Sequence, residues 1–241
     1  MLDFNDMDKV IAEERKRILL EYERRKREIP KDVYAFWEPW VMLAFTERER
    51  IMATMLHDEG IFPRKGDKCL EVGFGNLGML GNLITWGVRE TDLYGIELNA
   101  ERVAHAREIL PSASLYVGDG TRMPWEDETF RLVIASTVFT SILESNVRKV
   151  FAEEITRVLA QGGGLLWYDF KVNNPGNPNV KKVARKELET LFPKLKGKIR
   201  AATLAPPIAK FIAPRSWMLA TILQSVPFLR THLIAVLVKR S

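Results

Sequence analysis

Residues 68–78 read KCLEVGFGNLG, and this stretch decides the fold. A short apolar run typical of a buried strand leads directly into glycines spaced as Gly-x-Gly-x-x-Gly, at Gly73, Gly75 and Gly78. Glycines at a strand-to-helix turn let the backbone turn sharply and approach a ligand without Cβ clashes. The start of the following helix offers free N–H groups. The stretch therefore predicts a βα unit with a ligand site at the end of its strand.

Outward from this turn, short apolar runs alternate with amphipathic stretches. The pattern predicts strands over 68–72, 92–98, 114–117, 130–135 and 165–170, and helices over 77–86, 99–110, 145–159 and 180–192. Strand–helix alternation at this spacing is typical of a parallel sheet. Two further strand patterns, 198–204 and 232–239, flank an apolar helical stretch at 207–225. We expect this pair to finish the α/β sheet with an antiparallel edge.

Two helical patterns precede the sheet. Residues 8–28 are charged, with Glu and Lys or Arg at i,i+3 and i,i+4 spacing, which favours a self-paired surface helix over a nucleic-acid-binding arm. Residues 33–57 are aromatic-rich and helical in period, with a break at Pro39. We expect the chain to divide into N-terminal covering helices at 1–62 and a core at 63–241 with a lid insertion at 205–230.

The composition is that of a soluble globular protein, with 46% hydrophobic and 28% charged residues in a chain of 241. A single cysteine, Cys69, excludes a disulfide-built fold and suits a reducing compartment. No run of about 18 uncharged apolar residues occurs, and the charged N-terminus has no signal-peptide core. We therefore expect a cytoplasmic protein, with a peripheral position at the inner membrane face as a further option.

The net charge of +5 conceals an asymmetry. Residues 171–241 carry 14 basic side chains and two acidic ones, a net +12, whereas residues 1–170 carry a net −7. Such asymmetry suggests that the C-terminal part faces an anionic phosphate-bearing substrate, a membrane surface or nucleic acid. The alternative is a solvated basic face neutralised by the acidic part of the same fold.

A carboxylate at the end of the second predicted strand adds a second signal. Glu97 follows Gly78 by 19 residues and can accept both hydroxyls of a ribose. The ligand is therefore expected to contain an adenosine-like group. NAD and other adenosyl cofactors both satisfy this spacing, which leaves an NAD(P)-dependent oxidoreductase as an alternative function.

A third block follows the third predicted strand. It reads VGDGTRMPWEDETFRLVIAS, from Val117 to Ser136, and includes a carboxylate beside glycines that can accept the exocyclic amine of an adenine. With LEVGFGNLG, GIELN and FAEEITRVLAQGGGLLWYDF it forms an ordered set that resembles the class I S-adenosylmethionine-dependent methyltransferases of the small-molecule type. The resemblance spans roughly residues 67–170. It implies a Rossmann-like seven-stranded sheet, mostly parallel with an antiparallel last strand, plus N-terminal helices and a C-terminal helical lid.

The resemblance also implies S-adenosylmethionine as cofactor and a role for each motif residue. Glu71, Gly73 and Gly75 would shape the pocket for the amino-acid end of the cofactor, and Glu97 would accept the ribose hydroxyls. The adenine would contact Leu98, Asp119 and Gly120 or Thr121. Ser136 would lie near the sulfonium. The glycine loop departs from the family at Phe74, Asn76 and Leu77, where small or polar residues are common. This bulk either tightens the methionine pocket or weakens cofactor binding, so a non-catalytic cofactor-binding module is a further alternative.

Methyl transfer to an alcohol needs a base for the departing proton. Asp169 ends the fifth predicted strand and His232 opens the last one, so both are candidates for this role. A structural carboxylate that caps the loop is the alternative for Asp169. Asn173 and Asn174 lie in the loop beyond, as substrate-binding candidates or as turn formers.

The expected acceptor is a small molecule or glycan, with a sugar hydroxyl favoured. Residues that end the fifth strand resemble those of bacterial methyltransferases found with glycan-building enzymes. Tyr34 and Trp37 could stack on a sugar, or simply pack two helices onto the sheet edge. The basic C-terminal part suits an anionic or lipid-linked acceptor, and segment 205–230 forms either a lid or a face for an anionic bilayer.

Two further classes are disfavoured by what the sequence lacks. A nucleic-acid methyltransferase would explain the basic part, but the Asn/Asp-Pro-Pro-Tyr/Phe motif of amino-methylating enzymes of that class does not occur. No His/Cys/Asp/Glu cluster has the spacing of transition-metal ligands, so no metal residue is assigned. The sequence assigns no oligomeric state.

Overall fold

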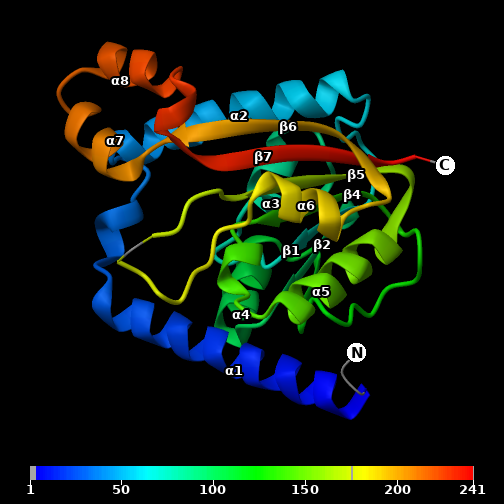
Figure 1. Cartoon of the computed structure of the whole chain (residues 1–241). Coiled ribbons are helices and arrows are strands. Elements are labelled where there is room, and N and C mark those ends of the chain that lie inside the picture. Colours follow the sequence, from blue (N-terminus) through cyan, green and yellow to red (C-terminus); the bar gives the residue numbers. More distant parts are fainter. Residues whose placement is uncertain (1–3, 175, 241) are drawn as a thin grey trace.

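A computed structural model describes residues 4–174 and 176–240 of the protein (Figure 1). The strands are β1 (Cys69–Val72), β2 (Leu93–Glu97), β3 (Ser114–Val117), β4 (Phe130–Ser136), β5 (Leu159–Phe170), β6 (Leu195–Leu204) and β7 (Arg230–Lys239). The helices are α1 (Phe4–Glu28), α2 (Pro39–Asp58), α3 (Leu80–Thr85), α4 (Ala100–Ile109), α5 (Ser145–Val158), α6 (Arg185–Leu191), α7 (Pro206–Ile212) and α8 (Trp217–Gln224).

The strands form one seven-stranded sheet in the order β3-β2-β1-β4-β5-β7-β6. Strands β1 to β5 are parallel, and β7 runs antiparallel to both of its neighbours, β5 and β6. The predicted fold class is therefore confirmed. The carboxyl ends of β1 to β6 lie along the same edge, which in an open α/β sheet is where ligands bind.

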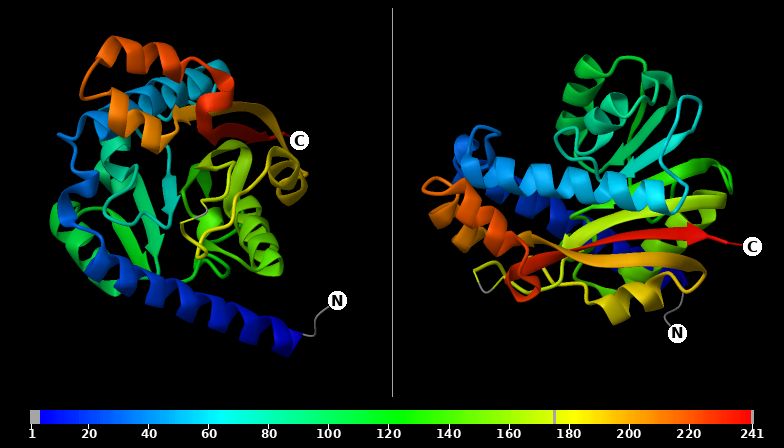
Figure 2. Two further views of the ribbon diagram at one scale, coloured as in Figure 1. Left: turned by 60° about the vertical axis from the view of Figure 1, so that its left-hand side comes forward. Right: turned by 90° about the horizontal axis from the view of Figure 1, so that it is seen from above.

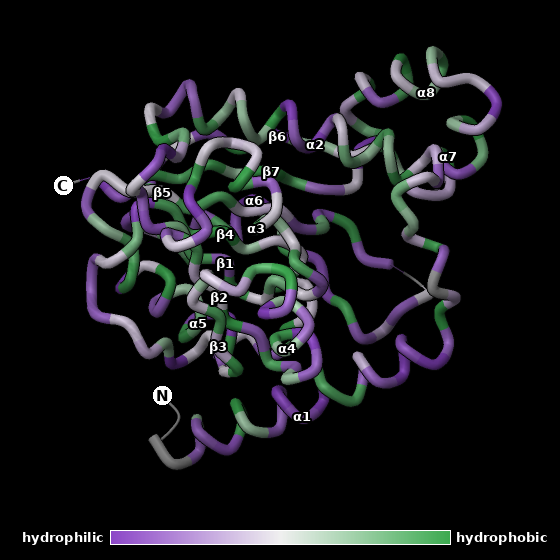
Figure 3. Tube along the Cα trace, turned by 180° about the vertical axis from the view of Figure 1, so that it is seen from behind, coloured by the Kyte–Doolittle hydropathy of each residue, from purple (hydrophilic) through white to green (hydrophobic). Residues whose placement is uncertain are grey.

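Helices cover both faces of the sheet, as the apolar strand runs require. On one face α5 buries Phe151, Ala152 and Ile155 against β1, β4 and β5. On the other, α2, α3 and α4 enclose a second core that includes Met52 and Met55 of α2. Figure 3 shows hydrophobic strands at the centre of the molecule and a more hydrophilic α1 at its margin.

The two N-terminal helices have different positions (Figure 2). Helix α2 lies on the sheet face next to β6 and β7, whereas α1 crosses the carboxyl edge beside α5. The sequence suggested that Pro39 breaks a helix, but Pro39 is the first residue of α2. Proline is tolerated there because the first helical position needs no N–H donor. A short 3-10 turn, Lys31–Tyr34, lies in the connection between the helices.

Helices α7 and α8 form the insertion between β6 and β7 and pack on the start of α2 (Figures 1 and 2). One helical stretch was expected over 207–225; Pro214 lies in the turn that separates the two helices. β5 begins at Leu159, before the predicted 165, and includes Gly162, Gly163 and Gly164; a Cβ on Gly163 would come 2.8 Å from a backbone oxygen of Arg131.

Other boundaries shift by a few residues. Helix α3 begins at Leu80 instead of 77, after a turn, and α6 covers only part of the predicted 180–192. Among the helices of residues 4–174 and 176–240, none has the length and apolar character needed to cross a bilayer.

Candidate functional site

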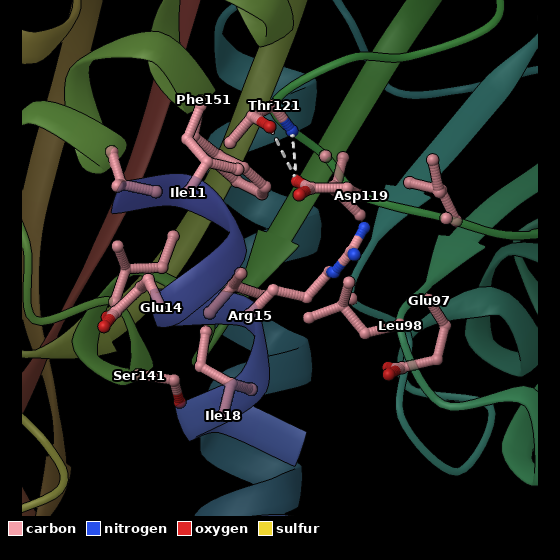
Figure 4. Close-up of a pocket in the computed structure, with 18 of the residues that line it drawn as sticks. Ile11, Glu14, Arg15, Ile18, Glu97, Leu98, Asp119, Thr121, Ser141 and Phe151 are labelled. Carbon is pink, nitrogen blue, oxygen red and sulfur yellow. Dashed lines mark hydrogen bonds between the residues drawn. The ribbon is translucent and has the colours of Figure 1, made fainter. Parts of the chain in front are cut away.

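A hollow opens at the carboxyl ends of β1 to β4 and is covered by α1 (Figure 4). Its floor comes from the ends of the strands and its wall from the β4–α5 connection. The lining includes Gly73, Glu97, Leu98, Asp119, Gly120 and Thr121. The structure thus brings together six residues that the sequence analysis assigned to one cofactor.

The glycine turn at the end of β1 needs its glycines for space as well as for conformation. Gly73 has a φ of +69°, and a Cβ there would lie 2.8 Å from a methyl group of Val138. Gly78 has a φ of +44°, and a Cβ would overlap the Glu71 carboxylate. A side chain at either position would displace the wall of the hollow or the carboxylate beneath the turn.

Glu71 supports this turn from below. Its carboxylate accepts hydrogen bonds from the N–H groups of Met79, at 2.7 Å, and Leu80, at 3.0 Å, where the chain enters α3. Burial raises the pKa of Glu71 to about 8, although both N–H groups favour the charged form. Glu71 does not line the hollow, so it shapes the pocket by fixing the backbone of the loop.

The atypical residues of the loop do not fill the hollow. Phe74 is only 1% exposed and points into the core, where its ring fits against the missing side chain of Gly95. Leu77 packs on the same core with a φ of +71°, a left-handed conformation that costs a non-glycine residue about 1–2 kcal/mol. The bulk of Phe74 therefore leaves the methionine pocket open, and Leu77 adds backbone strain to the loop.

Glu97 lies at the end of β2, 2% exposed, with its carboxylate held in place by backbone donors. The N–H of Gly75 donates to Oε2 at 2.9 Å and that of Asn99 to Oε1 at 3.0 Å. Arg102 approaches Oε2 at 3.8 Å, and its guanidinium lies 4.1 Å from the ring centre of Tyr22 on α1. Each oxygen keeps a lone pair, so the carboxylate can accept two hydroxyls.

Asp119 follows β3 and is oriented by the next turn of the chain. Its Oδ1 accepts hydrogen bonds from the N–H and the hydroxyl of Thr121, both at 2.8 Å. Gly120 packs so closely on Phe151 that a Cβ would overlap the ring. Among the described residues no hydrogen-bond donor contacts Oδ2 of Asp119, and Arg15 extends from α1 toward this carboxylate (Figure 4).

Polar contacts hold α1 over the hollow. Glu14 accepts from the N–H of Leu143, and Arg17 joins Glu14, at 2.9 Å, to the carbonyl oxygen of Ser141. Burial opposes ionisation of Glu14, but the hydrogen bonds from Arg17 and Leu143 outweigh it and lower its pKa. These contacts tie α1 to the β4–α5 connection, which forms the opposite wall.

Asp169 is fully buried at the end of β5, and its carboxylate is used internally. It accepts from the N–H groups of Thr140, at 3.0 Å, and Phe170, at 2.9 Å, and from the Thr140 hydroxyl. Burial raises its pKa to about 6 against these hydrogen bonds. This geometry favours the structural alternative, in which Asp169 ties β5 to the β4–α5 connection.

His232 lies at the start of β7, 4% exposed, between aromatic rings. Its ring stacks on Tyr168 at 4.7 Å between centres and contacts Phe170 at 3.9 Å. Burial, with a smaller effect from Arg48, lowers its pKa to about 3. The imidazole is therefore neutral near neutral pH, and Nδ1 lies 3.0 Å from the Thr231 hydroxyl.

The other predicted residues are dispersed along the same edge. Asn173 accepts from the N–H of Lys182 and Asn174 from that of Gly176, so both act as turn formers here. Tyr34 and Trp37 are exposed on the connection between α1 and α2, at 56% and 70%. Ser136 ends β4 half-buried and does not line the hollow.

Residues 69–163 match the model of a methyltransferase domain family. This stretch is therefore similar to a methyltransferase domain, and the chain has the fold of solved S-adenosylmethionine-dependent methyltransferases. No curated protein matches the chain.

Solved structures share the methyltransferase fold at low sequence identity. A Galdieria sulphuraria protein described as a sarcosine dimethylglycine methyltransferase has a TM-score of 0.63 at 13% identity, over 80% of this chain and 85% of its own. A methyltransferase from Methanosarcina mazei has a TM-score of 0.55 at 15% identity, over 77% of this chain and 97% of its own. A geranyl diphosphate C-methyltransferase from Streptomyces coelicolor, solved with S-adenosyl-L-homocysteine, gives 0.57 and 16%, over 79% of each chain.

The methyltransferase hollow fits S-adenosylmethionine by the chemistry of its donors and acceptors. Glu97 can accept two ribose hydroxyls and the open oxygen of Asp119 can accept an amine. The cradle at Gly73 admits a close approach that a Cβ would block. A dinucleotide-binding sheet has six parallel strands in the order 3-2-1-4-5-6. The antiparallel β7 between β5 and β6 departs from that arrangement, which disfavours the oxidoreductase alternative.

The sequence predicted N-terminal helices that cover the site, but not which side chains of α1 line it. Ile11, Ile18 and Tyr22 line the hollow from one face of this helix. Their spacing of seven and then four residues is a helical apolar stripe, which was visible in the sequence but is masked by the surrounding charges. Arg48 of α2 was also missed; it lies 5.4 Å from the Tyr168 ring centre, and its Nε has no hydrogen-bond partner among the described residues.

Proposed function

We propose that the protein transfers the methyl group of S-adenosylmethionine to a hydroxyl of a small sugar-containing acceptor. The observation that carries the transfer is the hollow in which Glu97 and Asp119 present open carboxylate oxygens beside the glycine turn. The sugar is supported by Tyr34 and Trp37, whose exposed rings offer flat faces for stacking on the route to this edge of the sheet.

The cofactor supplies an electrophilic methyl group, and the chain supplies position. Glu97 and Asp119 would hold the adenosine, and the Gly73–Gly75 turn would accommodate the amino-acid end. Helix α1, held by Glu14 and Arg17, would exclude water from the cofactor. The acceptor would approach from the end of β5 and the start of β7, where the chain is rich in aromatic rings.

His232 is the residue that we assign to the departing hydroxyl proton. It is the imidazole at the acceptor end of the sheet. Burial keeps it neutral and makes it a weak base, so we assign it the role of accepting a hydrogen bond from the hydroxyl and orienting it toward the methyl group, rather than that of a strong base. Asp169 does not serve, because its oxygens accept three hydrogen bonds from the fold. Replacement of His232 by Phe keeps the aromatic stack and should lower kcat at least tenfold while the affinity for S-adenosyl-L-homocysteine stays the same.

The test uses S-adenosylmethionine labelled in its methyl group and a panel of sugar phosphates, lipid-linked sugars, amines and carboxylic acids. We expect label on an oxygen of a sugar-containing acceptor, with no transfer by Glu97→Ala. Cofactor binding without transfer to any member of the panel would support the non-catalytic alternative. Transfer to an amine or carboxylate alone would contradict the sugar hydroxyl.

A further inference from the structure

The insertion formed by α7, α8 and the 3-10 turn Pro227–Leu229, which we call the cap, has two contrasting surfaces. Its inner surface buries small residues, Ala209, Ala213 and Ala220, against Leu43 of α2 and Leu204 of β6. Its outer surface carries large apolar side chains with exposed fractions between 42% and 84%: Phe211, Trp217, Met218, Leu219, Ile222 and Phe228. Six such side chains on one short insertion exceed the scattered apolar residues of an ordinary surface.

Further aromatic rings adjoin the cap. Tyr34, Phe36 and Trp37 are each more than half exposed on the connection between α1 and α2. The Tyr34 ring lies 5.7 Å from that of Trp40, which packs on the core of the cap. Figures 1 and 2 show this connection beside α7 in every view. The connection with its exposed rings therefore lies next to the cap.

The charges of the cap are positive. Lys210 and Arg215 lie among its apolar side chains, and no acidic residue occurs from 190 to 241. The Arg215 guanidinium lies 4.1 Å from the ring centre of Phe211, so its charge stays at the surface beside an exposed ring. Arg230, by contrast, is paired with Glu47 inside the fold and contributes little to the outer charge. The adjoining connection adds Asp32 and Glu38.

We propose that the outer surface of the cap binds the surface of a lipid bilayer that contains anionic lipids. Aromatic and aliphatic side chains insert about 5–10 Å into the boundary between headgroups and acyl chains, while Lys and Arg stay at the level of the lipid phosphates. Helix α8 has eight residues and carries apolar side chains on its solvent face, so it lies along such a surface rather than across it.

The same charges argue against a second copy of this chain as the occupant. In a twofold-symmetric dimer the same patch lies on both partners, so the contact would contain Lys210 and Arg215 from each copy and no acidic side chain of the cap. Like charges in a contact of low dielectric constant are unfavourable. An anionic bilayer complements these side chains instead.

The position of the cap determines which side of the protein a bound bilayer would face. Because β6 runs parallel to β5, its carboxyl end and the cap that follows lie along the same edge as the hollow. A bilayer bound to the cap would therefore face the acceptor end of the site. The binding itself does not depend on which acceptor is methylated, so it can be tested without any assay of methyl transfer.

The experiment is flotation of the full chain with vesicles of phosphatidylcholine, with and without phosphatidylglycerol. We expect binding to the anionic vesicles only, and its loss at high salt. The variant Ile222→Ser, combined with Met218→Ser, should reduce the bound fraction about tenfold. The matched control is Ile109→Ser on α4, where an isoleucine is 47% exposed away from the cap; it should bind like the wild type. Lys210→Glu with Arg215→Glu should also abolish binding.

Melting temperatures and the affinity for S-adenosyl-L-homocysteine establish that each variant is folded. Failure of the wild type to float with either vesicle would overturn the proposal. So would equal loss of binding in Ile109→Ser and in the cap variants. A dimer in sedimentation that Ile222→Ser dissociates, without vesicle binding, would instead assign the surface to a second copy and also overturn it.

Discussion

The two halves of the carboxyl edge use polar side chains in opposite ways. At the ends of β2 and β3, Glu97 and Asp119 are oriented by backbone donors and keep acceptor capacity open toward the hollow. At the end of β5 and in the loop beyond, the acceptor oxygens of Asp169 and Asn173 are used by neighbouring N–H groups and a hydroxyl. The cofactor half is prepared to bind, whereas polar groups in the acceptor half mainly hold the frame.

This difference between open and internally hydrogen-bonded oxygens bears on which groups can recognise the acceptor. A carboxylate that is fully hydrogen-bonded inside the fold cannot also recognise a ligand without cost. Under the proposed function, the acceptor would be recognised by groups that reach the edge from other elements, such as His232, Arg48 and the exposed rings between α1 and α2. The following predictions test this comparison, beginning with the largest expected effect.

Removal of the Asp169 carboxylate should strongly destabilise the protein. Asp169→Ala leaves the N–H groups of Thr140 and Phe170 and the Thr140 hydroxyl without their acceptor in a fully buried place, at a cost of about 3 kcal/mol in the free energy of unfolding. Urea unfolding measures this loss. Asp169→Asn keeps one acceptor oxygen and should lose less stability and little activity. A stable Asp169→Asn protein without methyl transfer would return Asp169 to the catalytic role.

Glu71 should make stability depend on pH. Its pKa is raised to about 8, so the folded protein holds a proton that the unfolded chain releases above the ordinary value of 4.5. The free energy of unfolding should therefore fall as the pH rises from about 4.5 to about 8, and level off at higher pH. Between about pH 6 and pH 9 the expected loss is about 2–3 kcal/mol. Glu71→Gln keeps an acceptor for the loop and should flatten this dependence in thermal unfolding. Equal slopes in both proteins would contradict the assignment.

Loss of the Glu97 carboxylate should weaken cofactor binding, in addition to the stability lost when the N–H groups of Gly75 and Asn99 have no acceptor. Two hydrogen bonds at about 1 kcal/mol each predict a roughly 30-fold loss of affinity for S-adenosyl-L-homocysteine in Glu97→Ala. Titration calorimetry measures it. Glu101→Ala is the matched control, because Glu101 is exposed on α4 and pairs only with Lys26 in the described structure. Unchanged affinity in Glu97→Ala would remove the distinction between the two halves.

The smallest effect is expected for Asn173. Its side chain accepts a single hydrogen bond, from the N–H of Lys182, at an exposed place. Asn173→Ala should change the free energy of unfolding by less than about 0.5 kcal/mol and kcat/KM by less than about twofold. A tenfold increase in the KM of the acceptor would instead place Asn173 in the binding site.

The sequence predicted which residues meet at the ends of β1 to β3, because they belong to motifs that are local along the chain. The turn from Glu71 to Gly78 and the residues after β2 and β3 each form a local motif, and parallel strands bring their ends together. The strands of the sheet were predicted from the alternation of short apolar runs with amphipathic stretches. The position of the Phe74 ring could not be predicted in this way. Its place in the core exists because Gly95, on the neighbouring strand β2, has no side chain.

The acceptor half was harder to predict because its contacts are distant in sequence. The partner of Asp169 is Thr140, 29 residues away, and Glu47 reaches Thr203 across 156 residues. No local pattern shows that these groups are satisfied. The same holds for α1, whose contact with the β4–α5 connection joins Glu14 to Leu143 over 129 residues.

The place of β7 inside the sheet has a consequence for biosynthesis. β6 leaves the ribosome before β7, yet it joins the sheet only by pairing with β7, which itself pairs with β5. Strands β1 to β5 can assemble on one another as they emerge, and the cofactor half with them. Between the emergence of β6 and that of β7, the cap and β6 have no place to dock on the sheet. For that interval the nascent chain exposes a strand edge and the apolar side chains of the cap, and surfaces of this kind are those through which incompletely folded chains aggregate.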